Sequence, residues 1–308
     1  MRLSIIVPCY NEASVLNLFY KEILQIENDL VGIDNIEFVF IDDGSTDSTL
    51  NEIKKIASTD NRVHYVSFSR NFGKEAAMLA GLEFSSGDYI AIMDADLQDP
   101  PSLLSKMLEA VINESYDCAA TRRVNRRGEP AIRSFFARAF YTLMRKTADV
   151  NIADGAHDYR LFSRKMADAI LLLKERNRFS KGLFSWVGFK TKWFEYENSK
   201  RRSGETKWSF LKLFFYSIDG IVAFSTFPLL LASVFGVVFS ISAICMIVFF
   251  AVRTIVWGNP VAGWASTICI ILLLGGIQLL SIGILGQYLA KIYTETKQRP
   301  IYIIDEKR

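Results

Sequence analysis

The chain has 308 residues, half of them hydrophobic, and its mean hydropathy is +0.18. That value is high for a soluble enzyme and low for a transporter with many spans, so we expect one soluble domain joined to a short membrane segment. A net charge of only +3 argues against nucleic acid as a partner. Four scattered cysteines, Cys9, Cys118, Cys245 and Cys269, show neither zinc nor disulfide spacing.

Short apolar runs alternate with helical patterns before residue 120. The runs read as buried strands at residues 3–7, 36–41, 63–68 and 89–93. Helical spacing or capping signals predict helices at 13–30, at 46–57 behind a Ser45 or Thr46 cap, at 74–84, and from Pro100-Pro101 onward. This alternation predicts an α/β fold, a mostly parallel Rossmann-like sheet with helices on both faces.

Polar residues follow each of these strands. The sequences are PCYNE, DDGSTD, SRNFGK and DADLQD, in chain order. Ligands bind at the carboxyl ends of the strands in such sheets, so we expect a site there.

The last of these loops carries Asp94 and Asp96, two carboxylates two positions apart at a strand end. Such a pair can hold a hard divalent cation, Mg²⁺ or Mn²⁺, and Gln98 can add a carbonyl oxygen. A bound metal would neutralise a nucleoside diphosphate leaving group without proton transfer. The alternative, a pair of solvated loop acids, loses weight because a second acidic loop follows the second strand.

That second loop has adjacent acids, Asp42 and Asp43, which can accept hydrogen bonds from a nucleotide base or a ribose. The alternative for DDGSTD is a turn followed by a helix cap, which accounts for its glycine, serine and threonine but not for two adjacent acids at a strand end. Arg70 and Lys74 bracket a turn at Gly73, and their natural partners are phosphate oxygens. A surface basic pair is the alternative.

Two runs without charge, 227–252 and 265–290, have 26 residues each. As helices each would be about 39 Å long, enough to span a ~30 Å hydrocarbon core. Lysine and arginine lie outside the outer ends of this hairpin, and only Arg253 lies in the link, which predicts cytoplasmic termini. The segment 209–225 predicts an interfacial helix, or else an early start of the first span. The expected division is 1–208 catalytic, 209–225 interfacial, 226–290 transmembrane and 291–308 tail.

Taken together, the motifs resemble the GT-A type, family 2 glycosyltransferases. The resemblance is closest to bactoprenol glucosyltransferases of O-antigen modification, and more distant to dolichol-phosphate mannose synthases. It rests on the motifs IIVPCYNE, VFIDDGSTDST, FSRNFGKEAAMLAGL, DADLQDP, HDYRLFSR, FSKGLFSWVGFKT and GETKWSF, and on the ending QYLAKIYTETKQRPIYII. It therefore covers almost the whole chain.

The resemblance implies roles for individual residues. Pro8, Tyr10, Glu12 and Asp42 would hold the uracil and ribose of a nucleotide-sugar, with support from Asp43. Asp94 and Asp96 would hold the metal and diphosphate. Asp158 would lie near the sugar and the acceptor, as an orienting group rather than a base, because a phosphate nucleophile is already ionised. The basic residues expected to meet the phosphate groups are Arg122, Arg201, Arg202 and Lys207, with an ordinary basic membrane flank as the alternative.

The implied activity is inverting transfer of one hexose, glucose from UDP-glucose, to undecaprenyl (polyprenyl) phosphate at the cytoplasmic leaflet of the inner (plasma) membrane. Aminoarabinose, mannose or N-acetylhexosamine donors remain alternatives, because relatives that use them keep nearly the same motifs. A processive synthase is disfavoured, because Q-x-x-R-W and further spans are missing from the sequence. An inactive membrane scaffold is disfavoured by the intact acids. Some relatives are tetramers, which leaves a homo-oligomer open.

Overall fold

The computed structural model describes residues 1–123, 142, 144, 146–147, 153, 155–196, 218–257 and 263–308. Its centre is an eight-stranded sheet in the order β7-β5-β6-β4-β1-β2-β3-β8. The strands are β1 (Arg2–Cys9), β2 (Asn35–Asp42), β3 (Val63–Phe68), β4 (Tyr89–Ile92), β5 (Cys118–Arg123), β6 (Ala156–Ser163), β7 (Thr191–Tyr196) and β8 (Ile304–Lys307).

The strands predicted from the sequence, β1 to β4, form the parallel part of the sheet. On one side β6 pairs antiparallel with β4 and with β5, while β7 runs parallel to β5. On the other side β8 pairs antiparallel with β3. The sheet is therefore mixed, with the predicted parallel core at its centre.

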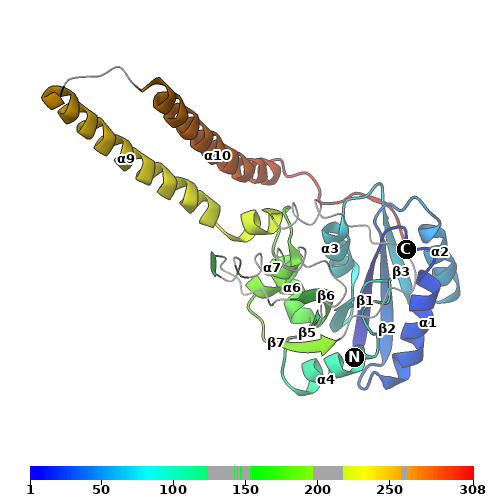
Figure 1. The fold of residues 1–308 in the computed structure, drawn as a ribbon. Helices are drawn as coiled ribbons and strands as arrows, with labels where there is room; N and C mark the ends of the chain where they lie inside the picture. The colour runs from blue at the N-terminus through cyan, green and yellow to red at the C-terminus, as the bar shows by residue number, and fades with distance from the viewer. Residues whose placement is uncertain are drawn as a thin grey trace.

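Helices cover both faces of the sheet (Figure 1). They are α1 (Leu16–Ile26), α2 (Thr49–Thr59), α3 (Lys74–Phe84), α4 (Leu103–Asn113), α6 (Arg164–Leu171) and α7 (Ser180–Trp186), with a 3₁₀ turn at Glu27–Asp29 after α1. The helix predicted at 13–30 is therefore shorter than expected, because α1 covers only Leu16–Ile26. The helix predicted to begin at 46 begins at Thr49, because Ser45 and Thr46 bond to Asn11 instead of capping it.

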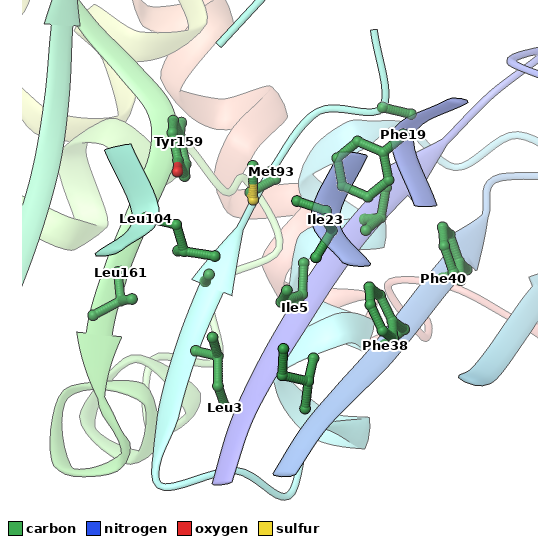
Figure 2. Packing of buried hydrophobic residues seen from close by; sticks show 14 of the residues in the cluster. Leu3, Ile5, Phe19, Ile23, Phe38, Phe40, Met93, Leu104, Tyr159 and Leu161 are labelled. Carbon is green, nitrogen blue, oxygen red and sulfur yellow. The ribbon is translucent and has the colours of Figure 1, made fainter. Parts of the chain in front are cut away.

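Alternate residues of the central strands enter two apolar layers, as the period of two in a strand requires. Ile5, Phe38 and Phe40 pack with Phe19 and Ile23 of α1 on one face (Figure 2). Ile6 and Val39, one position along, pack with α3 on the other. At Gly81 a Cβ would lie 2.1 Å from Ile6 Cγ2, so only glycine lets α3 approach β1 this closely. This close packing fixes the start of α3 at the carboxyl edge of the sheet.

Two long helices follow, α9 (Phe227–Trp257) and α10 (Trp264–Thr296). Their apolar stretches, Phe227–Phe250 and Ile270–Thr296, are long and apolar enough to cross a membrane, with mean hydropathies of 2.5 and 2.0. Figure 1 shows both projecting from the sheet and its helices. Of the predicted interfacial helix, 218–224 is helical and 209–217 lies outside the described residues.

The end of α10 is fastened to the sheet and its helices. Glu295 accepts hydrogen bonds from the backbone N–H groups of Arg176 and Asn177, at 2.8 and 3.1 Å. Lys291 Nζ donates to Asn177 Oδ1 at 2.9 Å. The chain then continues into β8, so the segment 291–308, expected to be only a tail, supplies the last helical turn and an edge strand.

Candidate active site

The loops after β1 and β2 are joined by hydrogen bonds at the carboxyl edge of the sheet. Asn11, in a left-handed conformation (φ 54°), donates its N–H to Ser45 Oγ and accepts from Thr46 N–H through Oδ1. Glu12 N–H donates to Thr49 Oγ1 at 2.8 Å. Asparagine tolerates this conformation better than most residues, so the local sequence favours the turn. The predicted nucleotide residues Pro8, Tyr10 and Glu12 thus lie beside the loop that follows Asp42.

The two acids of that loop have separate partners. Asp42 is buried and accepts from Ser67 Oγ at 2.8 Å and from Ser45 N–H at 3.2 Å. Asp43 accepts from the backbone N–H groups of Phe72 and Gly73. Burial outweighs these bonds and raises the pKa of Asp43 to about 6. Asp43 therefore holds the Arg70–Lys74 turn in place.

Asp94 and Asp158 lie side by side, bridged by one lysine. Lys74 Nζ lies 2.7 Å from Asp94 Oδ1 and 2.6 Å from Asp158 Oδ2. The antiparallel register explains the arrangement: Ile92 pairs with Arg160, so two positions further on Asp94 comes opposite Asp158. Lys74 was expected to meet phosphate oxygens, and here it contacts two carboxylates instead.

These ion pairs shift the pKa values of their members. Burial favours the neutral amine of Lys74, yet the carboxylates of Asp158 and Asp94 raise its pKa above the ordinary value. Burial likewise opposes the charge on Asp158, yet the cations of Lys74 and Lys181 hold its pKa far below the ordinary value. Asp158 is therefore a weak base in this arrangement.

A second group of polar side chains, unassigned by the sequence, lies next to Asp94. His157 Nδ1 is 2.9 Å from Asp99 Oδ2, and Tyr196 donates its hydroxyl to Asp99 Oδ1. Leu97, between Asp94 and Asp99, has a left-handed backbone conformation (φ 55°). The ligand atoms of Asp94, Asp99 and His157 all lie within 4.8 Å of one another, which suits a metal ion.

The donor set fits a divalent cation. Asp99 Oδ2 and His157 Nδ1 are both buried, and a carboxylate oxygen and an imidazole nitrogen are common metal ligands in proteins. Carboxylates suit Mg²⁺ and Mn²⁺, and a neutral imidazole adds a nitrogen ligand that favours Mn²⁺. The predicted ligands overlap with this group only at Asp94. Asp96 accepts from Gln98 N–H at 3.2 Å and belongs to the turn that shapes the loop.

Two predicted basic residues have protein partners. Arg70 donates to the Asn71 carbonyl oxygen at 2.9 Å, and its guanidinium lies 4.1 Å from the centre of the Phe72 ring. Arg122 lies within β5 and pairs with Glu195 of β7 at 2.5 Å. Strand pairing of β5 with β7 sets those two side chains next to each other. The other predicted basic residues, Arg201, Arg202 and Lys207, lie outside the described residues.

Asp99 and His157 were missed, although the signals for them are present. Asp99 is the third acid of DADLQDP, and His157 is one of only two histidines and precedes Asp158. Nothing local pairs these segments, because β6 is far along the chain from β4.

Comparison with known proteins identifies the family. The model of glycosyl transferase family 2 matches residues 4–171. The chain is a family 2 glycosyltransferase. A Bacillus subtilis (strain 168) protein, CsbB, is 45% identical over 308 residues, which cover 99% of this chain and 91% of that protein. A prophage bactoprenol glucosyl transferase homolog of Escherichia coli (strain K12) is 40% identical and covers 99% of this chain and 98% of its own. The bactoprenol glucosyl transferase of Shigella phage SfX is 38% identical, with 100% of both chains covered.

Membership confirms the expected class of fold and of enzyme. The mixed sheet with helices on both faces is the GT-A arrangement expected from the sequence. The family match spans β1 to α6 and therefore includes both acid loops, Lys74 and Asp158. The side chains at the carboxyl edge of this sheet accordingly form the candidate active site of a glycosyltransferase.

Proposed function

We propose that this glycosyltransferase transfers a single hexose, glucose from UDP-glucose, to undecaprenyl (polyprenyl) phosphate at the cytoplasmic leaflet of the membrane. The observation that carries the proposal is the joining of two features in one chain. The acid cluster of Asp94, Asp158 and Lys74 lies at the carboxyl edge of the sheet. A helix apolar enough to cross a membrane, α10, is bonded to residues 176–177 near that edge.

The nucleotide is assigned to the joined loops after β1 and β2. Asp42 and Glu12 lie there at the carboxyl ends of adjacent parallel strands, where such sheets bind nucleotides. Pro8 and Tyr10 complete this part of the proposed site. Asp43 supports it through its hydrogen bond to Phe72 N–H in the Arg70–Lys74 turn.

The diphosphate is assigned to the acid cluster with its metal. Asp94, Asp99 and His157 would hold Mn²⁺ or Mg²⁺, and such an ion neutralises the charge that develops on a leaving diphosphate. Lys74 would then exchange a carboxylate for a phosphate oxygen, because both sites compete for the same ammonium.

The acceptor is assigned from the chemistry of the nucleophile. A polyprenyl phosphate is ionised at neutral pH and needs no base. The low pKa of Asp158 agrees with this, since a carboxylate so stabilised accepts a proton poorly. We therefore assign Asp158 to orientation of the sugar and the attacking phosphate. Arg122, Arg201, Arg202 and Lys207 stay as the proposed cationic partners of the acceptor. Arg202→Ala or Lys207→Ala should raise the KM for polyprenyl phosphate.

Similarity to the bactoprenol glucosyl transferases of Escherichia coli and Shigella phage SfX supports glucose and a bactoprenol acceptor. The same geometry would serve aminoarabinose, mannose or N-acetylhexosamine donors. In either case we place the enzyme in the inner membrane as a multi-pass protein with both termini cytoplasmic.

The deciding experiment incubates the purified full-length chain with undecaprenyl phosphate and a panel of nucleotide-sugars, with Mn²⁺ or with EDTA. Mass spectrometry of the lipid fraction should detect a polyprenyl-phosphate hexose from UDP-glucose only with metal. Asp94→Asn is the inactive control. Product from another nucleotide-sugar would replace glucose in the proposal, and no lipid product from any donor would refute the polyprenyl phosphate acceptor.

A further inference from the structure

A pocket of about 370 Å³ lies where α10 meets the sheet and its helices. Its walls come from three places: the start of α3, residues 176–178, and residues between 293 and 301 at the end of α10 and just after it. Figure 1 shows the chain passing from α10 toward α3 in this region. None of the described residues assigned to the nucleotide, metal or acceptor lines it.

The lining is strongly basic. Arg176, Arg178, Lys297 and Arg299 contribute four cations, and Glu75 contributes the one carboxylate. Glu75 is already engaged, because its Oε2 accepts from both the N–H and the hydroxyl of Ser180. The charges that face the pocket from all three walls therefore favour an anion.

Arg178 makes the case for a bound ligand. It is only 8% exposed, although arginine is rarely buried without a partner. Within the described ranges its guanidinium makes one hydrogen bond, from Nη1 to the Leu173 carbonyl oxygen at 2.7 Å, and the carboxylates of Glu75, Glu175 and Glu83 attract its charge. Planar guanidinium donors match phosphate oxygens in geometry. The pocket thus presents an under-used phosphate-binding group.

The neighbouring surface of α10 indicates a ligand with an apolar part. Leu289 and Ile292 are exposed within two turns of the pocket residues Tyr293 and Lys297. If α10 crosses the bilayer as proposed above, these turns lie where hydrocarbon gives way to headgroups, since the helix has 33 residues and about 20 suffice to span. A molecule with its phosphate in the pocket could lay its chains along these side chains.

We infer that this pocket binds the phosphate of an anionic phospholipid of the surrounding membrane, outside the site of sugar transfer. Basic pockets at the cytoplasmic ends of membrane helices suit such headgroups. Because Glu75 and Lys74 are adjacent on α3, a lipid bound here would also brace the helix that carries the lysine of the acid cluster. The inference rests on the proposed membrane location but not on the identity of the sugar.

The test uses the full-length chain in detergent, with native mass spectrometry to measure bound lipid. Phosphatidylglycerol is compared with phosphatidylcholine, polyprenyl phosphate and inorganic phosphate. The variant Lys297→Gln/Arg299→Gln removes two exposed lining cations, and Lys21→Gln/Lys106→Gln removes two exposed lysines from α1 and α4 as the matched control. Phosphatidylglycerol should bind the wild type and the control alike, and about tenfold more weakly to the pocket variant.

A thermal measurement tests the buried cation itself. Phosphatidylglycerol should raise the Tm of the wild type, and Arg178→Gln should abolish that rise. Equal binding of phosphatidylglycerol to all variants would overturn the assignment, as would saturation by inorganic phosphate alone or a loss confined to polyprenyl phosphate. Transfer activity is assayed separately, so that failure of the proposed function leaves the lipid-binding result readable.

Discussion

Asp158 of β6 lies opposite Asp94 at the end of β4, and Lys74 Nζ contacts both carboxylates, at 2.6 and 2.7 Å. Three segments distant in the sequence thus supply one charge cluster. The positive charge of Lys74 offsets the repulsion between the two carboxylates. A metal ion bound to Asp94 would have to compete with this lysine for the same carboxylate.

Lys74→Gln should therefore lower stability and strengthen metal binding at once. Loss of the charged hydrogen bonds should cost about 1.5–3 kcal/mol of unfolding free energy. The two unpaired carboxylates should then bind Mn²⁺ more tightly, so that Mn²⁺ raises the Tm of the variant more than that of the wild type. Lys55→Gln, which removes an exposed pair with Glu52, is the control and should change the unfolding free energy by less than about 1 kcal/mol. If Mn²⁺ raises the Tm of wild type, Lys74→Gln and Lys55→Gln by the same amount, Lys74 does not compete with the metal.

Metal ligation by Asp94, Asp99 and His157 predicts an imidazole nitrogen bound to Mn²⁺. Pulsed electron paramagnetic resonance of the Mn²⁺-loaded enzyme should detect nitrogen coupling that His157→Gln removes. Asp99→Asn should raise the Mn²⁺ dissociation constant about tenfold or more. Asp96→Asn tests the ligand set expected from sequence. If Asp96→Asn weakens Mn²⁺ binding while Asp99→Asn does not, the sequence-based set is the correct one.

Asp43 gives the fold a pH dependence of known sign. Its pKa in the folded protein, about 6, exceeds its ordinary value of 3.8, so the folded state binds the proton more tightly than the unfolded chain. The stability contributed by this group is therefore lost as pH rises from about 4 to about 6, at a cost on the order of 3 kcal/mol above that window. The Tm of Asp43→Asn should rise relative to that of wild type as pH increases across this range, and the difference should then level off.

Asp29→Asn, which neutralises an exposed carboxylate, is the matched control for this titration. Its Tm difference from wild type should stay flat over the same pH range. A flat difference for Asp43→Asn as well would show that burial does not dominate at Asp43.

The proposed topology places the link between α9 and α10 outside the cell. With Cys245 and Cys269 replaced by alanine, Asn259→Cys should react with an impermeant maleimide added to intact cells. Ser58→Cys, exposed on α2, should react only after lysis. Labelling of position 259 only after lysis would reverse the orientation or remove the hairpin.

The sequence alone determined the features that local patterns encode. Apolar runs of strand length became β1 to β4, polar loops at their ends became the candidate site, and the two uncharged runs lie within α9 and α10. These features follow from periodicity and composition over a few residues, because each element buries or exposes its own side chains.

Only the tertiary structure decided which distant segments meet. The antiparallel insertion of β6 between β4 and β5 brings Asp158 opposite Asp94 and His157 against Asp99. The return of the chain end as β8 sets α10 beside α3 and forms the basic pocket. Strand order depends on packing over the whole sheet, and a local sequence pattern does not determine which strand pairs with the edge of a sheet. Asp94, Asp158 and Lys74 could therefore be predicted from the sequence, whereas Asp99, His157 and the pairing of these side chains could not.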